Sequence, residues 1–190
     1  MVRPAPRAGR DVNEREGRPL LVTALLPKDM QRWASDLRAL HFPPERNYLD
    51  AHVTLFHAIP PMCEGEARSL LAQLAKECAP VPGELEGLMS LGGGTALKLH
   101  SPDMLALRDA IGDSLHGMLT AQDQHRPRLH VTIQNKVSSK EAKALQAQLS
   151  GTIEPRAFAF RGLGLYFYDG GPWEEAGEYA FRGKRSVREL

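Results

Sequence analysis

Leu49-Asp50-Ala51-His52-Val53-Thr54-Leu55-Phe56 and Arg128-Leu129-His130-Val131-Thr132-Ile133-Gln134 share one pattern, His-Val-Thr followed by a branched aliphatic residue. Side chains alternate between the two faces of a β-strand, so the histidine and threonine of each run lie on one face and the aliphatic residues on the other. Each predicted strand therefore presents an imidazole beside a hydroxyl, with its apolar face turned to a core.

The composition is that of a globular protein of one domain or two small lobes. The chain has 190 residues, of which 42% are hydrophobic and 25% charged, and its net charge is +1. This charge gives no reason to expect avid binding to duplex DNA or to an anionic membrane, and no apolar run is long enough to span a bilayer. The N-terminus lacks the apolar stretch of a signal peptide, so we expect a cytoplasmic protein. Cys63 and Cys78 lack metal or redox spacing and are expected to be free thiols.

Two similar halves account for most of the chain. Each half is expected to run strand, helix, His-Val-Thr strand, helix, and Pro-Lys-Asp-Met and Ser-Pro-Asp-Met open the first helix of each. The matching order predicts an α+β, bilobal fold with a pseudo-two-fold axis, in which two antiparallel sheets line a central cleft and the helices lie outside. The predicted divisions are a disordered tail (1–18), a single bilobal domain (19–183) built from repeats of about 19–80 and 84–150 with closing strands in 155–182, and a frayed basic tail (184–190).

Individual elements follow from apolar spacing and from turn residues. Ser101 and Ser138 are expected to cap helices, the first of which carries an apolar stripe from Met104 to Met118. Other helices are expected from about Asp29 and over 64–79, and other strands over 20–26, 84–90, 96–100, 157–168 and 178–181.

Two facing histidine–threonine pairs suit phosphodiester chemistry. One imidazole can remove a proton from the attacking water or hydroxyl while the other protonates the departing oxygen, because histidine titrates near neutral pH. We therefore expect His52 and His130 to be the acid–base pair. The hydroxyls of Thr54 and Thr132 can hold the non-bridging phosphate oxygens as charge builds on them.

Two further side chains share these strand faces by alternation. Arg128 lies on the face of His130 and is expected to add positive charge for the phosphate, whereas the first motif has Asp50 at that place. Phe56 lies on the face of His52 and is the aromatic residue we favour for stacking on a base, with packing in the core as the alternative. His57, five residues from His52, is expected to face the other way.

The paired motifs resemble the His-x-Thr-hydrophobic signature of the two-histidine phosphoesterase superfamily. The resemblance covers the layout of residues 19 to 182 and the two tetrapeptides, and it is strongest to the bacterial branch of 2′-5′ RNA ligase-like proteins and RNA 2′,3′-cyclic phosphodiesterases. It implies a bilobal α+β fold with the motif residues in a central cleft. It also implies metal-independent chemistry, without a cofactor, on 2′,3′-cyclic phosphates or 2′-5′ linkages of nucleotides or RNA ends.

Other functions fit the sequence less well. A metal hydrolase would need convergent ligands, as in HExxH, and no such motif occurs. Gly92-Gly93-Gly94 lacks the lysine of a P-loop and is interpreted as a hairpin turn. The main alternative is a non-catalytic nucleotide or RNA-end binding protein of the same fold. We expect a monomer, while the preferred base, the direction of the reaction and the roles of base and acid stay open.

Overall fold

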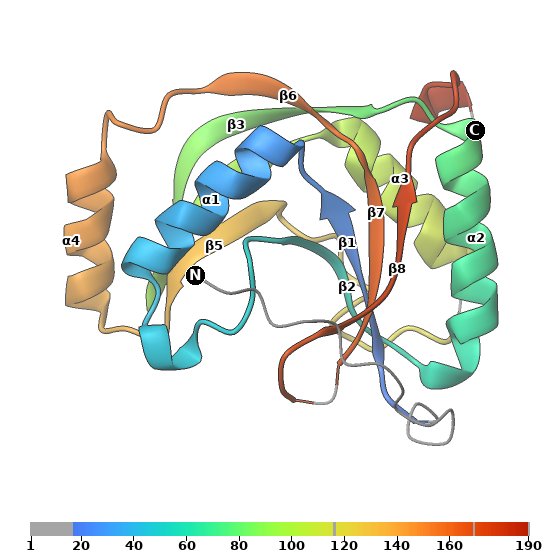
Figure 1. The fold of residues 1–190 in the computed structure, drawn as a ribbon, viewed down its shortest axis with the longest axis horizontal. Coiled ribbons are helices and arrows are strands. Elements are labelled where there is room, and N and C mark those ends of the chain that lie inside the picture. Colours follow the sequence, from blue (N-terminus) through green and yellow to red (C-terminus); the bar gives the residue numbers. More distant parts are fainter. Residues whose placement is uncertain (1–16, 116, 169, 190) are drawn as a thin grey trace.

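The computed structural model describes residues 17–115, 117–168 and 170–189, and it has an α+β fold with two four-stranded antiparallel sheets (Figure 1). The tail expected to be disordered lies outside the described residues except for its last two. The strands are β1 (Leu20–Leu25), β2 (Val53–Ile59), β3 (Val81–Ser90), β4 (Gly94–His100), β5 (His130–Asn135), β6 (Arg156–Phe160), β7 (Gly162–Phe167) and β8 (Glu174–Ala180), and the helices are α1 (Lys28–His41), α2 (Glu64–Glu77), α3 (Pro102–Ser114) and α4 (Ser139–Leu149).

The two His-Val-Thr strands occupy equivalent places in the two sheets. The first sheet has the strand order β2-β1-β7-β8 and the second has β5-β4-β3-β6. Each motif strand is therefore an edge strand with one hydrogen-bonding side unpaired within its sheet, and β2 and β5 contact each other. This arrangement confirms the predicted α+β class with two antiparallel sheets.

The helices tie the sheets together. Figure 1 shows α2 and α4 at opposite ends of the molecule, where α2 packs on β7 and β8 and α4 packs on β3 and β4. Helix α1 crosses over from its own half of the sequence to pack on β5. Apolar side chains from both sheets join in one core, which includes the fully buried Val53, Leu55, Val131 and Ile133 of the motif strands.

Helix starts follow local capping chemistry. The Ser101 hydroxyl accepts a hydrogen bond from the backbone N–H of Met104, and Pro102 lies in the first turn. Ser138 and Glu141 form the expected capping box. No described helix is long and apolar enough to cross a membrane.

Three local expectations were wrong. Helix α3 ends at Ser114, so Met118 lies beyond it on the surface. The run 157–168 is two strands in different sheets, divided at Arg161, whose N–H donates to the Leu25 carbonyl. The C-terminal tail is held against α2 rather than frayed, since Arg185 pairs with Glu77.

Candidate active site

One cavity of about 390 Å³ brings the four motif residues together. His52 and Thr54 reach it from the start of β2, and His130 and Thr132 from β5. These four side chains are partly buried, whereas the aliphatic residues between them lie in the core. The alternation along the strands therefore gives the arrangement expected for this part of the site.

Both imidazoles are anchored in the same way. The Nδ1 of His52 lies 2.8 Å from the carbonyl oxygen of Asp50, and the Nδ1 of His130 lies 2.7 Å from that of Arg128. A carbonyl oxygen can only accept, so each ring donates through Nδ1–H. Nε2 is then the nitrogen left to exchange a proton with a ligand, and the two motifs present the same tautomer.

The environment of His52 disfavours its charged form. Burial lowers the pKa of His52 to about 4, and nearby Arg38 and His130 act in the same direction against the hydrogen bond to the Asp50 carbonyl. Trp173 contributes to the burial of His52, because the centroids of the two rings lie 4.4 Å apart. His52 is therefore neutral at pH 7, with Nε2 ready to accept a proton.

Helix α1 fixes the segment that leads into the first motif. The Gln31 side-chain amide donates to the Ala51 carbonyl at 2.6 Å, and the Ala51 N–H donates to the Ser35 hydroxyl at 3.1 Å. Buried Arg38 donates to the Leu49 carbonyl at 3.0 Å and to the Thr132 carbonyl at 2.8 Å. One guanidinium thus binds the backbone of both motifs and sets their relative position.

A β-bulge changes which side chains of β2 face the cavity. Thr54 pairs with Thr23 and Phe56 with the adjacent Val22, so β2 has one extra residue at Leu55. Leu55 and Phe56 both turn into the core, and His57 then faces the cavity.

The interpretations of Phe56 and His57 were therefore wrong. Phe56 is fully buried beneath the guanidinium of Arg108, whose Cζ lies 4.5 Å from the ring centroid, so its ring offers no face to a base. His57 lines the same cavity as His52 and His130. Among the described residues, Trp173 is the Phe, Tyr or Trp side chain that lines this cavity.

Arg128 lines the cavity from an exposed position two residues before the start of β5, where it can contact an anion. Its counterpart Asp50 lines a neighbouring cavity. The structure thus brings Arg128, but not Asp50, to the four motif residues.

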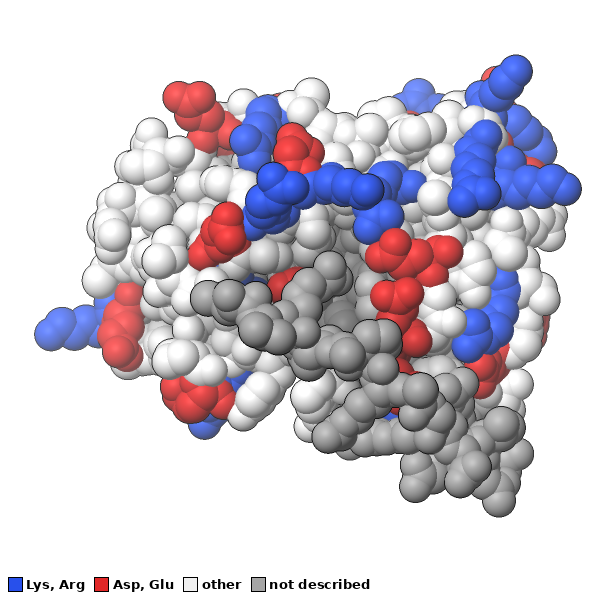
Figure 2. Space-filling model, in the orientation of Figure 1, with Lys and Arg blue, Asp and Glu red and all other residues white. Residues whose placement is uncertain are grey.

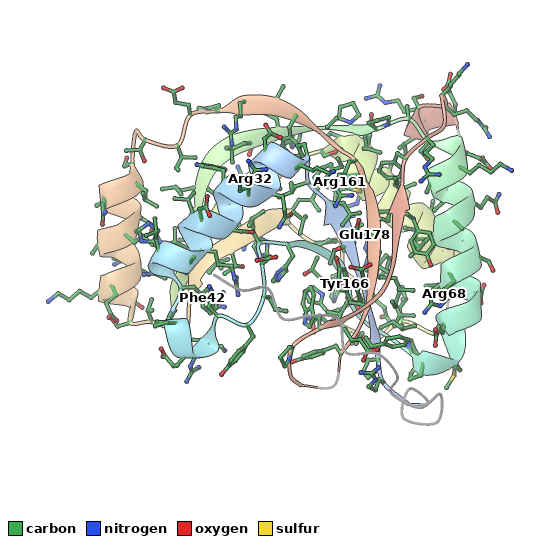
Figure 3. The ribbon with its side chains drawn as sticks, in the orientation of Figure 1. Arg32, Phe42, Arg68, Arg161, Tyr166 and Glu178 are labelled. Atoms are coloured by element: carbon green, nitrogen blue, oxygen red, sulfur yellow. The ribbon has the colours of Figure 1, made fainter. Side chains whose placement is uncertain are left out.

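The neighbouring cavity also has a volume of about 390 Å³, and it shares His52 and Trp173 with the first. Figure 2 shows acidic side chains gathered over β8 beside a hollow in this face. Glu178 accepts hydrogen bonds from Arg161, and both lie near Tyr166 on the wall formed by β7 and β8 (Figure 3). Burial raises the pKa of Tyr166, with the nearby Glu178 and Glu175 adding to the effect. The carboxylates make this cavity less suited to an anion than the first.

The described residues contain no group of three or more His, Cys, Asp or Glu side chains arranged to hold a metal ion. Cys63 and Cys78 are free and buried, and burial raises the pKa of both thiols. A low thiolate fraction at neutral pH makes either residue a poor nucleophile.

A sequence model of the 2′-5′ RNA ligase superfamily matches residues 26–172, which include both motifs. The chain belongs to this superfamily. Membership supports a phosphoesterase- or ligase-type activity. A search of curated proteins found no match.

Solved structures share the fold of this superfamily member at low sequence identity. The crystal structure of TT0787 of Thermus thermophilus has a TM-score of 0.60 at 15% identity over 88% of this chain and 100% of its own. E. coli LigT complexed with 3′-AMP has a TM-score of 0.60 at 18% identity over 87% and 99% of the two chains. E. coli LigT complexed with NADP⁺ has a TM-score of 0.56 at 20% identity over the same shares.

Several residues of the site carried no signal in the sequence. Asp123 contacts His57 across 66 residues of sequence, and Arg38 contacts Thr132 across 94. Nothing in the local sequence distinguished Trp173 as a residue that lines the cavity. A bulge, which reverses the alternation, cannot be read from apolar spacing, so His57 was assigned to the wrong face.

Proposed function

We propose that this member of the superfamily is a metal-independent phosphoesterase that acts on the 2′,3′-cyclic phosphate or 2′-5′ phosphodiester of nucleotides or RNA ends. The observation that carries the proposal is the pair of imidazoles, both anchored through Nδ1, that share one cavity with two threonines. Two equivalent proton-transfer groups suit a reaction in which one oxygen loses a proton and another gains one.

The low pKa of His52 supports its assignment as the base. A neutral Nε2 takes the proton of the attacking water as its oxygen bonds to phosphorus, and the negative charge that develops there makes His52 more basic than in the empty site. The bond from phosphorus to the ribose oxygen breaks as the imidazolium form of His130, which carries a proton on both ring nitrogens, transfers its Nε2 proton to that oxygen. The products are a phosphomonoester and a free ribose hydroxyl.

Thr54, Thr132 and Arg128 support the charge on the phosphoryl group. Thr54 and Thr132 line the cavity from opposite strands, so one hydroxyl can donate to each non-bridging oxygen. Arg128 adds an exposed cation at the rim. E. coli LigT is complexed with 3′-AMP and with NADP⁺ in its crystal structures, which supports a nucleotide as a ligand of the present chain.

A panel of nucleoside 2′,3′-cyclic phosphates and 2′-5′-linked dinucleotides, incubated with and without EDTA, tests the proposal. We expect turnover of at least one class at a rate that EDTA leaves unchanged. Saturable binding without turnover would instead support the nucleotide-binding alternative. Loss of turnover in EDTA, restored by a divalent ion, would show that a metal takes part.

A further inference from the structure

His57 is a third histidine of the catalytic cavity. Its side chain is 42% exposed, and its Nδ1 lies 3.1 Å from the Oδ1 of Asp123. An ionised carboxylate only accepts, so Nδ1 carries the proton and Nε2 is the nitrogen left for a ligand. The orientation of this ring therefore matches that of His52 and His130, with a carboxylate in place of a carbonyl.

Several contacts fix the Asp123 carboxylate beside the His57 ring. Its side chain is 1% exposed and accepts hydrogen bonds from the backbone N–H groups of His57 and Ala58, at 2.8 to 3.0 Å. Burial by itself would raise the pKa of Asp123, but the hydrogen bonds from the His57 side chain and from the two backbone N–H groups outweigh it and hold the pKa below its usual value. Asp123 is thus a fixed, buried negative charge behind His57.

The loop that carries Asp123 is itself secured from α3. The buried guanidinium of Arg108 donates to the backbone carbonyls of Asp123 and His125, and Arg126 pairs with Asp109. The same loop leads directly into Arg128. His57 and Arg128 are therefore held on the rim of one cavity by one loop.

The charge of the cavity favours an anion near His57. Its described lining includes His52, His57, His130 and Arg128 but no aspartate or glutamate. In the second motif the same strand position holds Asn135, whose side-chain oxygen accepts from the N–H of Lys136 and which does not line the cavity. The third histidine therefore belongs to one half of the site only.

We propose that His57, in the form protonated on both ring nitrogens, donates from Nε2–H to an anionic oxygen of the substrate, and that Asp123 is the positioning residue that orients the ring through Nδ1–H. This inference rests on the proposed function for the identity of the anion as a phosphate group. It adds a hydrogen-bond donor from the β2 side to a cavity that Arg128 lines from the segment before β5.

Sulfate binding tests the proposed role of His57 directly, because the charge of sulfate is constant between pH 5.5 and 8.5 and its binding needs no turnover. Its Kd is measured by calorimetry at constant ionic strength for the wild type and for His57→Gln. The matched control is His100→Gln, because His100 is an exposed residue at the end of β4 that does not line the cavity. We expect His57→Gln to bind about tenfold more weakly at pH 6, as for the loss of one charge-assisted hydrogen bond, and His100→Gln to bind like the wild type. The change for His57→Gln should appear in KM for a cyclic phosphate more than in kcat.

Asp123→Asn separates positioning from packing. The asparagine oxygen can still accept from the backbone, but its amide donates to Nδ1 and places the proton of a neutral ring on Nε2. Sulfate binding should therefore weaken less between pH 6 and pH 8 in Asp123→Asn than in the wild type. Four groups face His57: His52, His130, Arg128 and Asp123. Because two of them are histidines, the pH dependence of sulfate binding attributed to His57 is that of the wild type minus that of His57→Gln.

An unchanged Kd in His57→Gln would overturn the proposal, as would absence of sulfate binding by the wild type or a wild-type pH slope in Asp123→Asn. If His57→Gln fails to fold, His57→Asn replaces it, with the same expected loss. Sulfate binding that depends on His57, in a protein that turns over no cyclic phosphate, would count against the proposed function and not against His57.

Discussion

At the unpaired edge of each motif strand, a charged side chain binds the backbone: a carboxylate at β2 and a guanidinium at β5. On β2, the carboxylate of Asp123 accepts from the consecutive N–H groups of His57 and Ala58. On β5, the guanidinium of Arg38 donates to the carbonyl of Thr132. An edge strand exposes both donors and acceptors, so either solution satisfies backbone groups beside the cavity. The comparison shows that a duplicated chemical motif can be supported by two unrelated sets of contacts.

The bulge itself is duplicated. In β5, Thr132 pairs with Ala96 and Gln134 with the adjacent Thr95, which matches the extra residue in β2. Phe56 and Gln134 are the corresponding buried residues, and Gln134 accepts a hydrogen bond from the Thr95 hydroxyl. The backbones of β2 and β5 are therefore alike at this bulge, although the buried side chains there differ.

Alanine at either motif histidine should have the largest effect, and it tests whether the two halves are equal in chemistry. His52→Ala and His130→Ala should each lower kcat by about 10²–10⁴, because each removes one proton-transfer group. Steady-state kinetics with a nucleoside 2′,3′-cyclic phosphate measures this. Full activity in the double variant would exclude the paired-histidine mechanism.

Removal of Arg38 tests whether one guanidinium supports both halves. Arg38→Met should lower the free energy of unfolding by about 2–4 kcal/mol, because it leaves the carbonyls of Leu49 and Thr132 without their donor. Urea unfolding measures the loss. Arg32→Met is the control, since Arg32 is an exposed residue of the same helix (Figure 3). Equal stability of the two variants would show that Arg38 does not hold the motifs together.

The pKa of His52 makes the β2 half sensitive to acid. Because this pKa is about 4 in the folded protein and ordinarily 6.5, the unfolded chain binds the proton more readily, and stability falls as the pH drops from about 6.5 to 4. His52→Asn removes this titration, so it should lose about 2 kcal/mol less stability than the wild type between pH 7 and pH 4.5. Urea unfolding at the two pH values measures the difference, and parallel losses would mean that His52 is not buried in its neutral form.

Trp173 should give the smallest effect. Trp173→Ala uncovers His52, so the acid limb of the kcat/KM profile should move to higher pH, and KM should rise by a few-fold as a stacking surface is lost. Tyr168→Ala changes an exposed aromatic that does not line the cavity and should leave both quantities unchanged. A Trp173→Ala profile identical to that of the wild type would exclude Trp173 as the cover of His52.

Much of the fold followed from local patterns. Period-two apolar residues placed the strands, and Ser101 and Ser138 marked helix starts, because capping is decided within four residues. The strands after residue 155 were harder, since partner strands lie far along the chain. Nothing within 157–168 indicates that Arg161 divides two strands that join different sheets.

The sequence alone predicted the four motif residues and the roles proposed for them, because imidazole chemistry and strand alternation are properties of a few adjacent residues. Only the tertiary structure decided that Phe56 is core, that His57 faces the cavity, that Asp123 and Arg38 close the two strand edges and that His52 is neutral. Bulges, burial and contacts across 66 or 94 residues arise from packing of the whole chain, and that packing distinguishes two halves whose motifs are nearly the same.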